Sequence, residues 1–380
     1  MNIVFWLNNP PVACKGVFNE TVRQWKEDCY YIIDNKMQDD RKLLMTDESD
    51  FAGAKVIYLA EHENKKAVVT EFVNQHIDDV HIFNGYKSGV AKYIECVRAA
   101  SKLAKIIVWA ERPAYKGSNR FRCLFEKAYL LNHLYYAMRY RNKISALLPL
   151  GQAGVKAYSR LGWKENSMFP FMYLPQMEEN LPKANETGRT VKLLYLGRFR
   201  KMWKGIGILM EALDQIEGDY QIDFVGGYGE DKEEVMQWIE AHPQATYKGT
   251  WPIDTACSKM QDYDVCIVPS YYEGWNVTVN ETIMAGIGCI CTDEAVSNEL
   301  IENSDSGLVV KAKSSQALAD AIQKVVNNPE MVDRWKSNAF EYKNCITAQI
   351  IAEYLLSIIT FLFCESGMEP EAPWIKQRKK

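Results

Sequence analysis

Residues 264–292 read DVCIVPSYYEGWNVTVNETIMAGIGCICT, and this stretch decides the fold class. The short apolar run Val265–Val268 stops at Pro269, a helix is expected from near Asn276 to Gly286, and a second apolar run follows. A strand, a helix and a strand in this order make a βαβ unit, whose two strands lie parallel in one sheet. The stretch therefore predicts an α/β domain built on a parallel sheet.

The same alternation extends along the whole chain. Strands are expected at Ile3–Leu7, Val56–Ala60, Val80–Phe83, Ile106–Ala110, Ala146–Leu148, Val191–Leu196, Gln221–Val225, Thr246–Lys248 and Val265–Val268, and helices at Gly205–Ile216 and Asp231–Ala241. Residues 170–190 have weak periodicity and many Pro, Asn and Glu residues, as a linker does. Because 380 residues exceed the roughly 250–300 of one core, we predict a Rossmann-like domain at 1–175, a second at 176–345, and a C-terminal helix with a basic tail at 346–380.

The composition excludes some classes of protein. The chain is 47% hydrophobic and 25% charged with a net charge of -4, which is typical of a globular protein and predicts no nucleic-acid partner. Its ten cysteines form no CxxC pair, which indicates a reducing, cytoplasmic compartment, and its five histidines lack metal-binding spacing. No secretion signal is expected, and Ile346–Cys364, which contains Gln349 and Glu353, predicts a terminal amphipathic helix rather than a membrane span.

A cationic loop follows the expected strand Val191–Leu196. Ligands bind open parallel sheets at the carboxyl ends of the strands, so such loops are where a site is expected. Gly197 ends the strand, and Arg198 and Lys204 precede the next helix, an arrangement that suits a phosphate; the alternative is a solvated basic loop. After the next strand, Gly226 either lets the backbone approach a ligand or makes a turn. Neither this loop nor the one after the first strand matches the GxGxxG dinucleotide fingerprint, which disfavours an NAD-dependent oxidoreductase.

Two carboxylates frame the turn and helix that follow Val265–Val268. Glu273 lies in the turn, and Glu281 lies eight positions later inside the helix. A carboxylate accepts two hydrogen bonds at once, which suits the neighbouring hydroxyls of a ribose or a hexose. Between the two, unpaired N–H groups are expected at the helix start on Asn276, Val277 and Thr278, where they suit a phosphate. The alternative is that Glu273 complements the helix dipole and Glu281 is an exposed helix residue.

The order of these motifs resembles glycosyltransferase family 4 (group 1), a family of retaining enzymes with the GT-B fold. The resemblance covers Val191 to Ile322 and is carried by LLYLGRFRKMWKG, DFVGGYGED, YKGTW, DVCIVPSYYEGWNVTVNETIMAGIGCICTD, ELIENSDSGLVV and ALADAI. Glu273 and Glu281 match the family's Glu-x7-Glu pair. The resemblance implies an α/β fold of GT-B type, in which two Rossmann-like domains face each other across a cleft and a C-terminal helix crosses back.

The resemblance also implies roles for single residues. Arg198 and Lys204 would hold the diphosphate of a nucleotide sugar, and Glu273 would contact the hydroxyls of the donor sugar. Glu281 would bind the ribose, and Trp251 would lie near the base. The full set of implied donor-binding residues is Gly16, Gly197, Gly226, Trp251, Asn276, Val277, Thr278 and Glu281. Because cations aimed at the leaving diphosphate can replace a metal ion, we expect neither a metal nor a further cofactor.

Two features of the first half bear on the acceptor. Where many family members have a histidine facing the donor sugar, this chain has IIVWAERPAYKG, in which Glu111 is either a catalytic carboxylate or the ion-pair partner of Arg112 or Lys116. The segment Asn119–Lys143 mixes basic residues with aromatics and leucines. It predicts either an interfacial helix at a membrane surface or a core-packing helix with basic ends.

Together these observations predict a metal-independent, retaining hexosyltransferase of polysaccharide biosynthesis. It would move a sugar from a nucleotide diphosphate sugar to a glycan or lipid-linked acceptor, in the cytoplasm and in peripheral contact with the inner face of the membrane. The alternatives that stay open are a nucleotide-sugar epimerase of the same fold and a non-catalytic protein that binds a nucleotide sugar.

Overall fold

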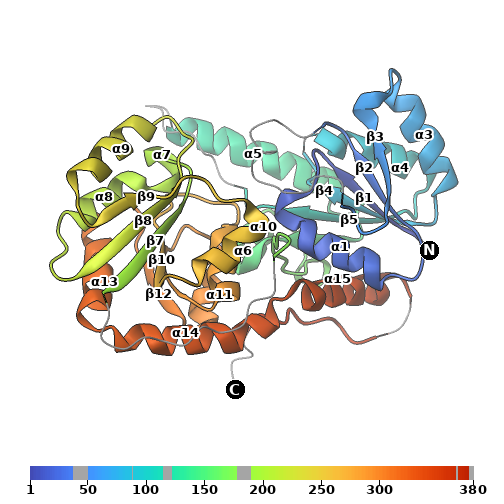
Figure 1. Cartoon of the computed structure of the whole chain (residues 1–380). Helices are drawn as coiled ribbons and strands as arrows, with labels where there is room; N and C mark the ends of the chain where they lie inside the picture. The colour runs from blue at the N-terminus through green and yellow to red at the C-terminus, as the bar shows by residue number, and fades with distance from the viewer. Residues whose placement is uncertain (37–49, 88, 114–121, 178–189, 365–366, 376–380) are drawn as a thin grey trace. The chain divides into compact units, whose positions relative to one another are not determined.

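The computed structural model describes residues 1–36, 50–87, 89–113, 122–177, 190–364 and 367–375 (Figure 1). Internal contacts divide the chain into two compact units. The first unit comprises Met1–Leu174 and Ala348–Ala372, and the second comprises Pro175–Thr347 and Pro373–Lys380. Each unit has its own sheet and its own hydrophobic core.

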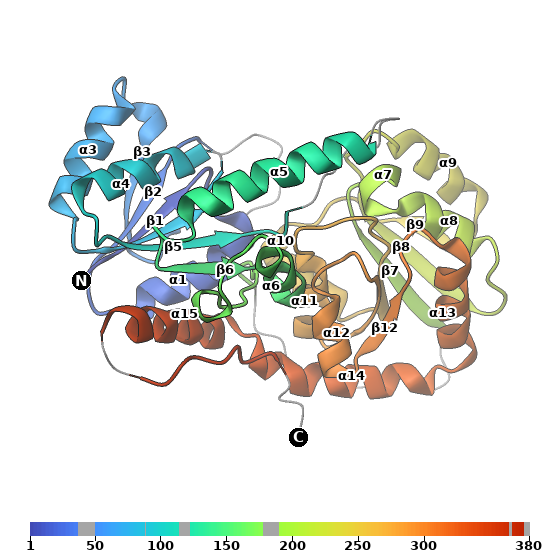
Figure 2. The same cartoon turned by 180° about the vertical axis from the view of Figure 1, so that it is seen from behind.

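The first unit is built on a sheet of six parallel strands. Its strands are β1 (Ile3–Leu7), β2 (Cys29–Ile33), β3 (Lys55–Tyr58), β4 (Val80–Asn84), β5 (Lys105–Ala110) and β6 (Ala146–Pro149), in the order β3-β2-β1-β4-β5-β6. Its helices are α1 (Lys15–Gln24), α3 (Lys65–Gln75), α4 (Ile94–Ala100), α5 (Arg122–Tyr140), α6 (Gly151–Ser159) and α15 (Ala348–Phe363). They lie on both faces of the sheet, which explains why β1 is buried at every position (Figures 1 and 2).

The second unit repeats this plan with a second parallel sheet. Its strands are β7 (Val191–Gly197), β8 (Tyr220–Gly226), β9 (Ala245–Tyr247), β10 (Val265–Val268), β11 (Gly288–Thr292) and β12 (Gly307–Val310), in the order β12-β11-β10-β7-β8-β9. Its helices are α7 (Lys201–Lys204), α8 (Ile206–Leu213), α9 (Lys232–Ala241), α10 (Ile253–Met260), α11 (Val277–Ala285), α12 (Asn298–Ser304), α13 (Ser315–Asn327) and α14 (Glu330–Tyr342).

The strand order gives each sheet one topological switch point. In the first unit β1 and β4 are neighbours, and the chain leaves them toward opposite edges of the sheet. In the second unit β7 and β10 have the same relation. Open parallel sheets bind ligands outside the carboxyl ends of the strands at such a point. The loops after β1 and β4, and those after β7 and β10, are therefore where sites are expected.

Two glycines let loops of the second unit approach these strand ends closely. Gly205 has φ +67°, and a Cβ there would lie 1.8 Å from the carbonyl oxygen of Pro269. Gly226 has φ +120°, and a Cβ there would lie 2.1 Å from the carbonyl oxygen of Gly197. Since both positions combine positive φ with contact to a neighbouring backbone, only glycine fits them without rearrangement. The loop after β7 thus packs directly on the end of β10.

The structure differs from the expected elements in three places. The strand β2 was not expected, because its apolar run of five residues is flanked by charged segments. The strand expected at Val56–Ala60 ends at Tyr58 and continues as one turn of 3-10 helix. The helix expected at Gly205–Ile216 runs from Ile206 to Leu213, preceded by the four-residue helix α7 inside what was expected to be a loop.

The apolar segment near the C-terminus forms α15. By length and composition alone, the helical stretch Glu330–Phe363 could cross a membrane. In the first unit, however, α15 lies along α1 and buries Ile351, Leu355 and Ile358 (Figures 1 and 2). One apolar face packed on protein and a second face with Gln349 is the pattern of an amphipathic helix.

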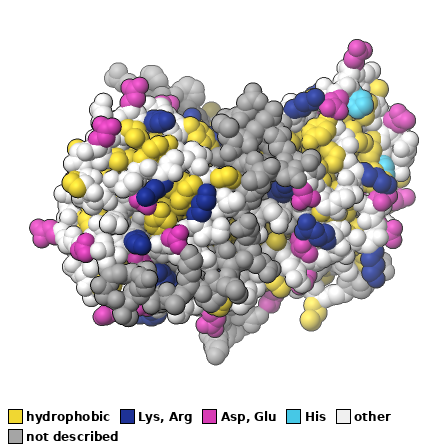
Figure 3. Space-filling model, viewed as in Figure 1, with side chains coloured by type: hydrophobic (Ala, Val, Ile, Leu, Met, Phe, Trp, Pro, Cys, Tyr) yellow, Lys and Arg dark blue, Asp and Glu magenta, His cyan; other side chains and the backbone are white. Residues whose placement is uncertain are grey.

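Charges of both signs are mixed over the described surface. In the view of Figure 3, Lys and Arg side chains alternate with Asp and Glu side chains, without a large region of one sign. Nucleic-acid binding needs clustered positive charge along a face or groove. This face of the molecule offers no such cluster among its described residues.

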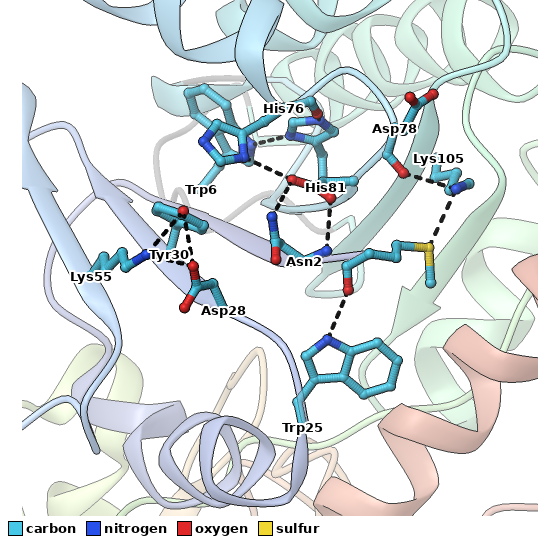
Figure 4. A network of polar contacts seen from close by, with 12 residues as sticks. Asn2, Trp6, Trp25, Asp28, Tyr30, Lys55, His76, Asp78, His81 and Lys105 are labelled. Carbon is cyan, nitrogen blue, oxygen red and sulfur yellow. Dashed lines mark hydrogen bonds and ion pairs between the residues drawn. The ribbon is translucent and has the colours of Figure 1, made fainter.

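A buried polar network closes the amino-terminal edge of the first sheet (Figure 4). Asp79 accepts hydrogen bonds from the backbone N–H of Asn2 at 2.7 Å and contacts Nδ1 of His76 at 2.7 Å. Trp6 Nε1 donates to Nδ1 of His81 at 3.1 Å, and His81 Nε2 lies 3.0 Å from the carbonyl oxygen of His76. Because an indole only donates, Nδ1 of His81 accepts and Nε2 carries the proton. His81 is therefore neutral in the folded protein.

This arrangement predicts a loss of stability in mild acid. Burial lowers the pKa of His81 from 6.5 to about 4. Between these values the unfolded chain binds more protons at this site, so the stabilisation is complete above pH 6.5 and falls as the pH drops toward 4. We expect His81 to account for on the order of 3 kcal/mol of the unfolding free energy lost over this window. Urea unfolding at several pH values measures it.

The matched variant is His81→Gln, which does not titrate and has one acceptor and one donor for the same two partners. Its unfolding free energy should depend less on pH over this window than that of the unmodified protein. His62→Gln, which removes an exposed imidazole outside the network, serves as the control. An undiminished pH dependence in His81→Gln would contradict this assignment.

Candidate functional site

Two loops meet at the switch point of the second sheet. One follows β7 and contains α7; the other follows β10 and leads to α11. The backbone N–H of Tyr271 donates to the carbonyl oxygen of Trp203 at 2.8 Å, and Gly205 lies against Pro269. These backbone contacts fix the two loops to each other, so the side chains they carry have defined relative positions.

An ion pair joins the two loops. Lys204 Nζ lies 2.6 Å from Oε1 of Glu273. The same Oε1 accepts hydrogen bonds from Ser270 Oγ at 2.9 Å and Asn276 Nδ2 at 3.3 Å. The side chains of Lys204 and Glu273 are 28% and 15% exposed, so water screens their attraction less than at a free surface. Lys204 and Glu273, which the sequence placed in catalysis, are thus brought together.

Arg198 follows the last residue of β7, at the edge of the site that borders β8. Its guanidinium lies 4.9 Å from the centre of the Tyr228 ring, which belongs to the loop after β8. The Tyr195 hydroxyl donates to the carbonyl oxygen of Arg198 at 2.7 Å and holds its backbone in place. Stacking on a ring engages the face of a guanidinium, whereas its N–H groups point outward along the edge. This geometry suits an anion in the plane of the guanidinium.

The N-terminus of α11 is more occupied than expected. Asn276 is its N-cap, and the side-chain Oδ1 of Asn276 accepts from the N–H of Thr278 at 3.0 Å. The N–H of Asn276 itself donates to the carbonyl oxygen of Ala295 at 3.3 Å. The expectation of three unpaired N–H groups is therefore wrong for two of them, because a neighbouring loop carbonyl takes the N–H of Asn276 and the capping side chain takes the N–H of Thr278. Of these three N–H groups, that of Val277 is the one with no acceptor among the described residues.

Glu281 is buried in α11. Its exposed fraction is 3%, which rules out the alternative of an exposed helix residue. Burial raises the pKa of this carboxyl from 4.5 to about 7, while a hydrogen bond with Thr278 and the charge of Lys204 oppose the rise. A carboxyl is costly to bury, and Lys204 is close enough to favour its charged form. Lys204 therefore pairs directly with Glu273, and its charge also favours the ionised form of Glu281.

The remaining predicted donor-binding residues lie in different places. Trp251 is half-buried, 6.1 Å from the ring of Tyr263, and Nζ of Lys259 lies 5.5 Å from its centre. Gly197 and Gly226 are paired in register at the ends of β7 and β8, on the border of the site. Gly16 is buried in α1 and belongs to the first unit.

Glu111 also belongs to the first unit, directly after β5. The Tyr158 hydroxyl donates to its carbonyl oxygen at 2.7 Å, and the Tyr173 hydroxyl donates to its Oε1 at 3.4 Å. Burial and the charge of Glu111 raise the pKa of Tyr173 well above its usual value, so this hydroxyl stays a donor. The predicted ion pair of Glu111 with Lys116 falls outside the described residues.

Sequence reasoning missed two members of the site. Ser270 donates to Glu273, and its position directly after an apolar strand and before a turn was the available signal. Tyr228 supports Arg198, but nothing in GGYGED distinguishes a ring that faces a cation from an exposed turn residue. Among the residues that the structure describes, no three His, Cys, Asp or Glu side chains are grouped to hold a metal ion.

Comparisons with solved structures identify the fold. HepE (Alr3699) of Anabaena in complex with UDP superposes with a TM-score of 0.74 at 16% identity, covering 95% of this chain and 100% of that one. The apo form of the lipopolysaccharide outer core galactosyltransferase WaaB gives 0.70 at 14% identity, covering 95% and 99%. Two parallel six-stranded sheets with these neighbours are the GT-B fold, so the predicted α/β fold class is confirmed.

Sequence comparisons point to the second unit. TuaC of Bacillus subtilis (strain 168), whose name assigns it to teichuronic acid biosynthesis as a glycosyltransferase, is 31% identical over 144 residues, 37% of this chain and 35% of that protein. A phosphatidyl-myo-inositol mannosyltransferase of Mycobacterium leprae (strain TN) is 23% identical over 175 residues, 45% of this chain and 46% of that protein. The chain thus spans less than half the length of the curated relatives that it matches. Residues 176–342, which carry the Lys204–Glu273 pair and Glu281, match the family of glycosyl transferases group 1.

Proposed function

We propose that this protein is a retaining, metal-independent glycosyltransferase of family 4 that takes a hexose from a nucleotide diphosphate sugar. The observation that carries the proposal is one cation, Lys204, which is ion-paired with Glu273 and whose charge also acts on the buried Glu281, at the switch point of the second sheet. A diphosphate needs cations, and the two sugars on either side of it need hydrogen-bond acceptors. One cation and two carboxylates thus match one diphosphate and the two sugars attached to it.

In this proposal the cations stabilise the leaving group. As the bond to the anomeric carbon breaks, negative charge grows on the diphosphate, and Lys204 and Arg198 supply preorganised positive charge there. An ammonium group has three N–H donors, and Lys204 uses one of them in its hydrogen bond to Glu273. The same Nζ can therefore also donate to a phosphate oxygen. A divalent ion is then unnecessary. The free N–H of Val277 at the start of α11 adds a further donor.

The two carboxylates have different environments and therefore different proposed roles. Ser270 and Asn276 hold one oxygen of Glu273, Oε1, so we assign Oε2 to the hydroxyls of the donor sugar. Glu281 lies in a dry environment, where a pair of ribose hydroxyls would replace the lost water as hydrogen-bond donors. We place Trp251 near the base and Gly197 and Gly226 beside the diphosphate.

The acceptor and the location are part of the same proposal. The exposed side of α5 carries Leu131, Tyr135 and Met138, which are 65%, 53% and 54% exposed, next to the basic Arg139. Apolar side chains beside basic ones suit an anionic membrane surface. We therefore propose a glycan or lipid-linked acceptor in polysaccharide biosynthesis, in the cytoplasm at the inner face of the membrane, which vesicle flotation can test. The names of the mannosyltransferase and TuaC relatives are consistent with such acceptors.

A screen of nucleoside diphosphates tests the first requirement of the proposal, which is that the protein binds one of them. A ligand at a hundredfold over its Kd stabilises a protein by about 2.7 kcal/mol, which a thermal-shift measurement detects. We expect one nucleoside diphosphate to stabilise the protein in the presence of EDTA, and the matching nucleotide sugar to support transfer under the same conditions. Conversion of the donor without an acceptor would instead identify an epimerase, and binding without any reaction a non-catalytic protein. Stabilisation by none would remove the proposal.

Lys204→Ala should retain the fold and lose activity. Loss of one stabiliser of transition-state charge typically lowers turnover by about 100-fold to 1000-fold, and we expect that range in a transfer assay. Lys201→Ala is the matched control, because Lys201 lies in the same short helix and pairs with Glu234 outside the site. Near-normal turnover in Lys204→Ala, or an equal loss in Lys201→Ala, would refute the role of Lys204.

Glu281 should make nucleoside diphosphate binding depend on pH. With a pKa of about 7, this carboxyl is mostly ionised at pH 8 and mostly protonated at pH 6, and only the ionised form accepts from both ribose hydroxyls. Affinity measured by calorimetry should therefore fall about tenfold from pH 8 to pH 6. Glu281→Gln should bind more weakly at pH 8 and lose this share of the pH dependence. The titration of the diphosphate itself is common to both proteins, so their difference isolates Glu281.

A further inference from the structure

The chain returns to the second unit shortly before its end. Ala348–Ala372, which contains α15, belongs to the first unit, whereas Pro373 begins the final segment of the second unit. Residues 367–371 precede this return and are mostly exposed, with Met368 at 92%. Trp374, in contrast, has no exposed surface. A fully buried indole shortly after an exposed segment is an anchor, because burying a Trp side chain removes about 150–250 Å² from water.

Three side chains from α12 and α14 hold Trp374. Its indole Nε1 donates to Oε1 of Glu299 at 2.9 Å. Its carbonyl oxygen accepts from Nδ2 of Asn303 at 3.2 Å and from the Tyr342 hydroxyl. Glu299 lies in the first turn of α12 and Asn303 in its last turn, while Tyr342 ends α14. Trp374 is therefore bonded to both turns of α12.

The position of α12 depends on contacts of this kind. The helix has seven residues, and a helix this short is not stable in isolation. It packs on α11 and α14 (Figure 2). The negative charge of Glu299 suits the N-terminus of α12, and the indole N–H of Trp374 engages the same carboxylate. Trp374 thus fixes the start of α12.

The loop between β11 and α12 holds the turn that carries Glu273. Ser297, the N-cap of α12, donates through Oγ to the carbonyl oxygen of Asn276 at 2.9 Å. The carbonyl oxygen of Ala295 accepts from the N–H of Asn276 at 3.3 Å, and that of Glu294 accepts from the N–H of Glu273 at 3.1 Å. The backbone of this turn is therefore held by a loop that ends at the start of α12.

This loop needs a restraint outside itself. Val296 has a positive φ, and a residue in that conformation persists only where its surroundings fix it. We propose that Trp374 is a positioning residue of the donor site. Through the bond of its indole N–H to Glu299 it holds the start of α12, and thereby the loop that aligns Glu273 with the donor sugar. The inference rests on the proposed function, which assigns Glu273 to that sugar.

Removing the indole and returning it as a free ligand tests the proposal in the full chain. Trp374→Ala keeps the backbone carbonyl but leaves a space of the size of an indole, and such cavities bind matching ring compounds. We expect kcat/KM for the nucleotide sugar to fall about tenfold to a hundredfold, as small misplacements of site residues cause. Added indole should restore most of the loss. Indene, a ring system of the same size without an N–H, should restore less, because it cannot donate to Glu299.

The loss should fall on transfer more than on nucleoside diphosphate binding. That binding is assigned to the cations and to Glu281, so the Kd from calorimetry should change less than kcat/KM does. Trp374→Phe, which keeps an aromatic ring, should lose less activity than Trp374→Ala. The matched control is Trp238→Ala, because Trp238 in α9 also donates its indole N–H to a carboxylate of the second unit, that of Asp214 at 3.0 Å. This control should lower the melting temperature without changing the kinetic constants.

Hydrogen exchange gives a readout that needs no substrate. In Trp374→Ala the amides of Glu273 and Asn276 should exchange faster, and added indole should slow them, while the amides of β8 should keep their rates. Faster exchange throughout the second unit, or equal losses of nucleoside diphosphate binding and transfer, would make Trp374 a residue of general stability and overturn the proposal. Equal rescue by indole and indene would overturn it as well, because the bond to Glu299 would then be unnecessary.

The outcomes separate this inference from the proposed function. If neither a nucleoside diphosphate nor a nucleotide sugar binds the unmodified protein, the proposed function fails, but faster exchange at Glu273 that indole reverses would still assign the loop to the control of Trp374. If the unmodified protein transfers a sugar and Trp374→Ala transfers it equally well, the proposed function stands and Trp374 has no positioning role.

Discussion

The ion pair between Lys204 and Glu273 is the contact on which the geometry of the second unit depends. Its two residues come from loops more than sixty positions apart in the sequence, and they meet because β7 and β10 are neighbours in the sheet. At the same place Gly205 leaves no room for a Cβ against the carbonyl oxygen of Pro269, and Glu273 also accepts from Asn276, the N-cap of α11. The parallel sheet thus brings the two loops together, and the ion pair fixes the side chains of Lys204 and Glu273 relative to each other.

The same strand order occurs in both units, but the two switch points carry different chemistry. In the second unit, the Lys204–Glu273 ion pair lies beside the N-cap of α11, which suits a ligand that carries both charge and hydroxyl groups. In the first unit, amides and one carboxylate line a small cavity without a described cation. A repeated backbone plan therefore does not imply repeated function, because the loops and not the sheet decide what binds.

Much of the fold and part of the site could be predicted from the sequence. Strands such as β1 and β10 were predicted at their observed bounds because buried parallel strands are continuous apolar runs. β2 was missed because its apolar run is flanked by charged segments, and its identity as a strand depends on pairing with β1 and β3. The Glu273 and Glu281 spacing was readable, but the burial of Glu281 was not, because it depends on how α10 and β10 pack against α11.

The least readable feature is a strained residue beside the site. Val296 has φ +61°, which is an outlier for a β-branched side chain, and such backbones cost on the order of 1–3 kcal/mol. The flanking bonds explain how it persists: Asn276 donates to the carbonyl oxygen of Ala295, and Ser297 Oγ donates to that of Asn276 at 2.9 Å. The strain is therefore balanced by contacts that hold the N-cap of α11, and through Asn276 they reach Glu273. The loop that contains Val296 therefore helps to fix the position of Asn276 and, through it, that of Glu273. Nothing in the sequence of this loop indicates that role.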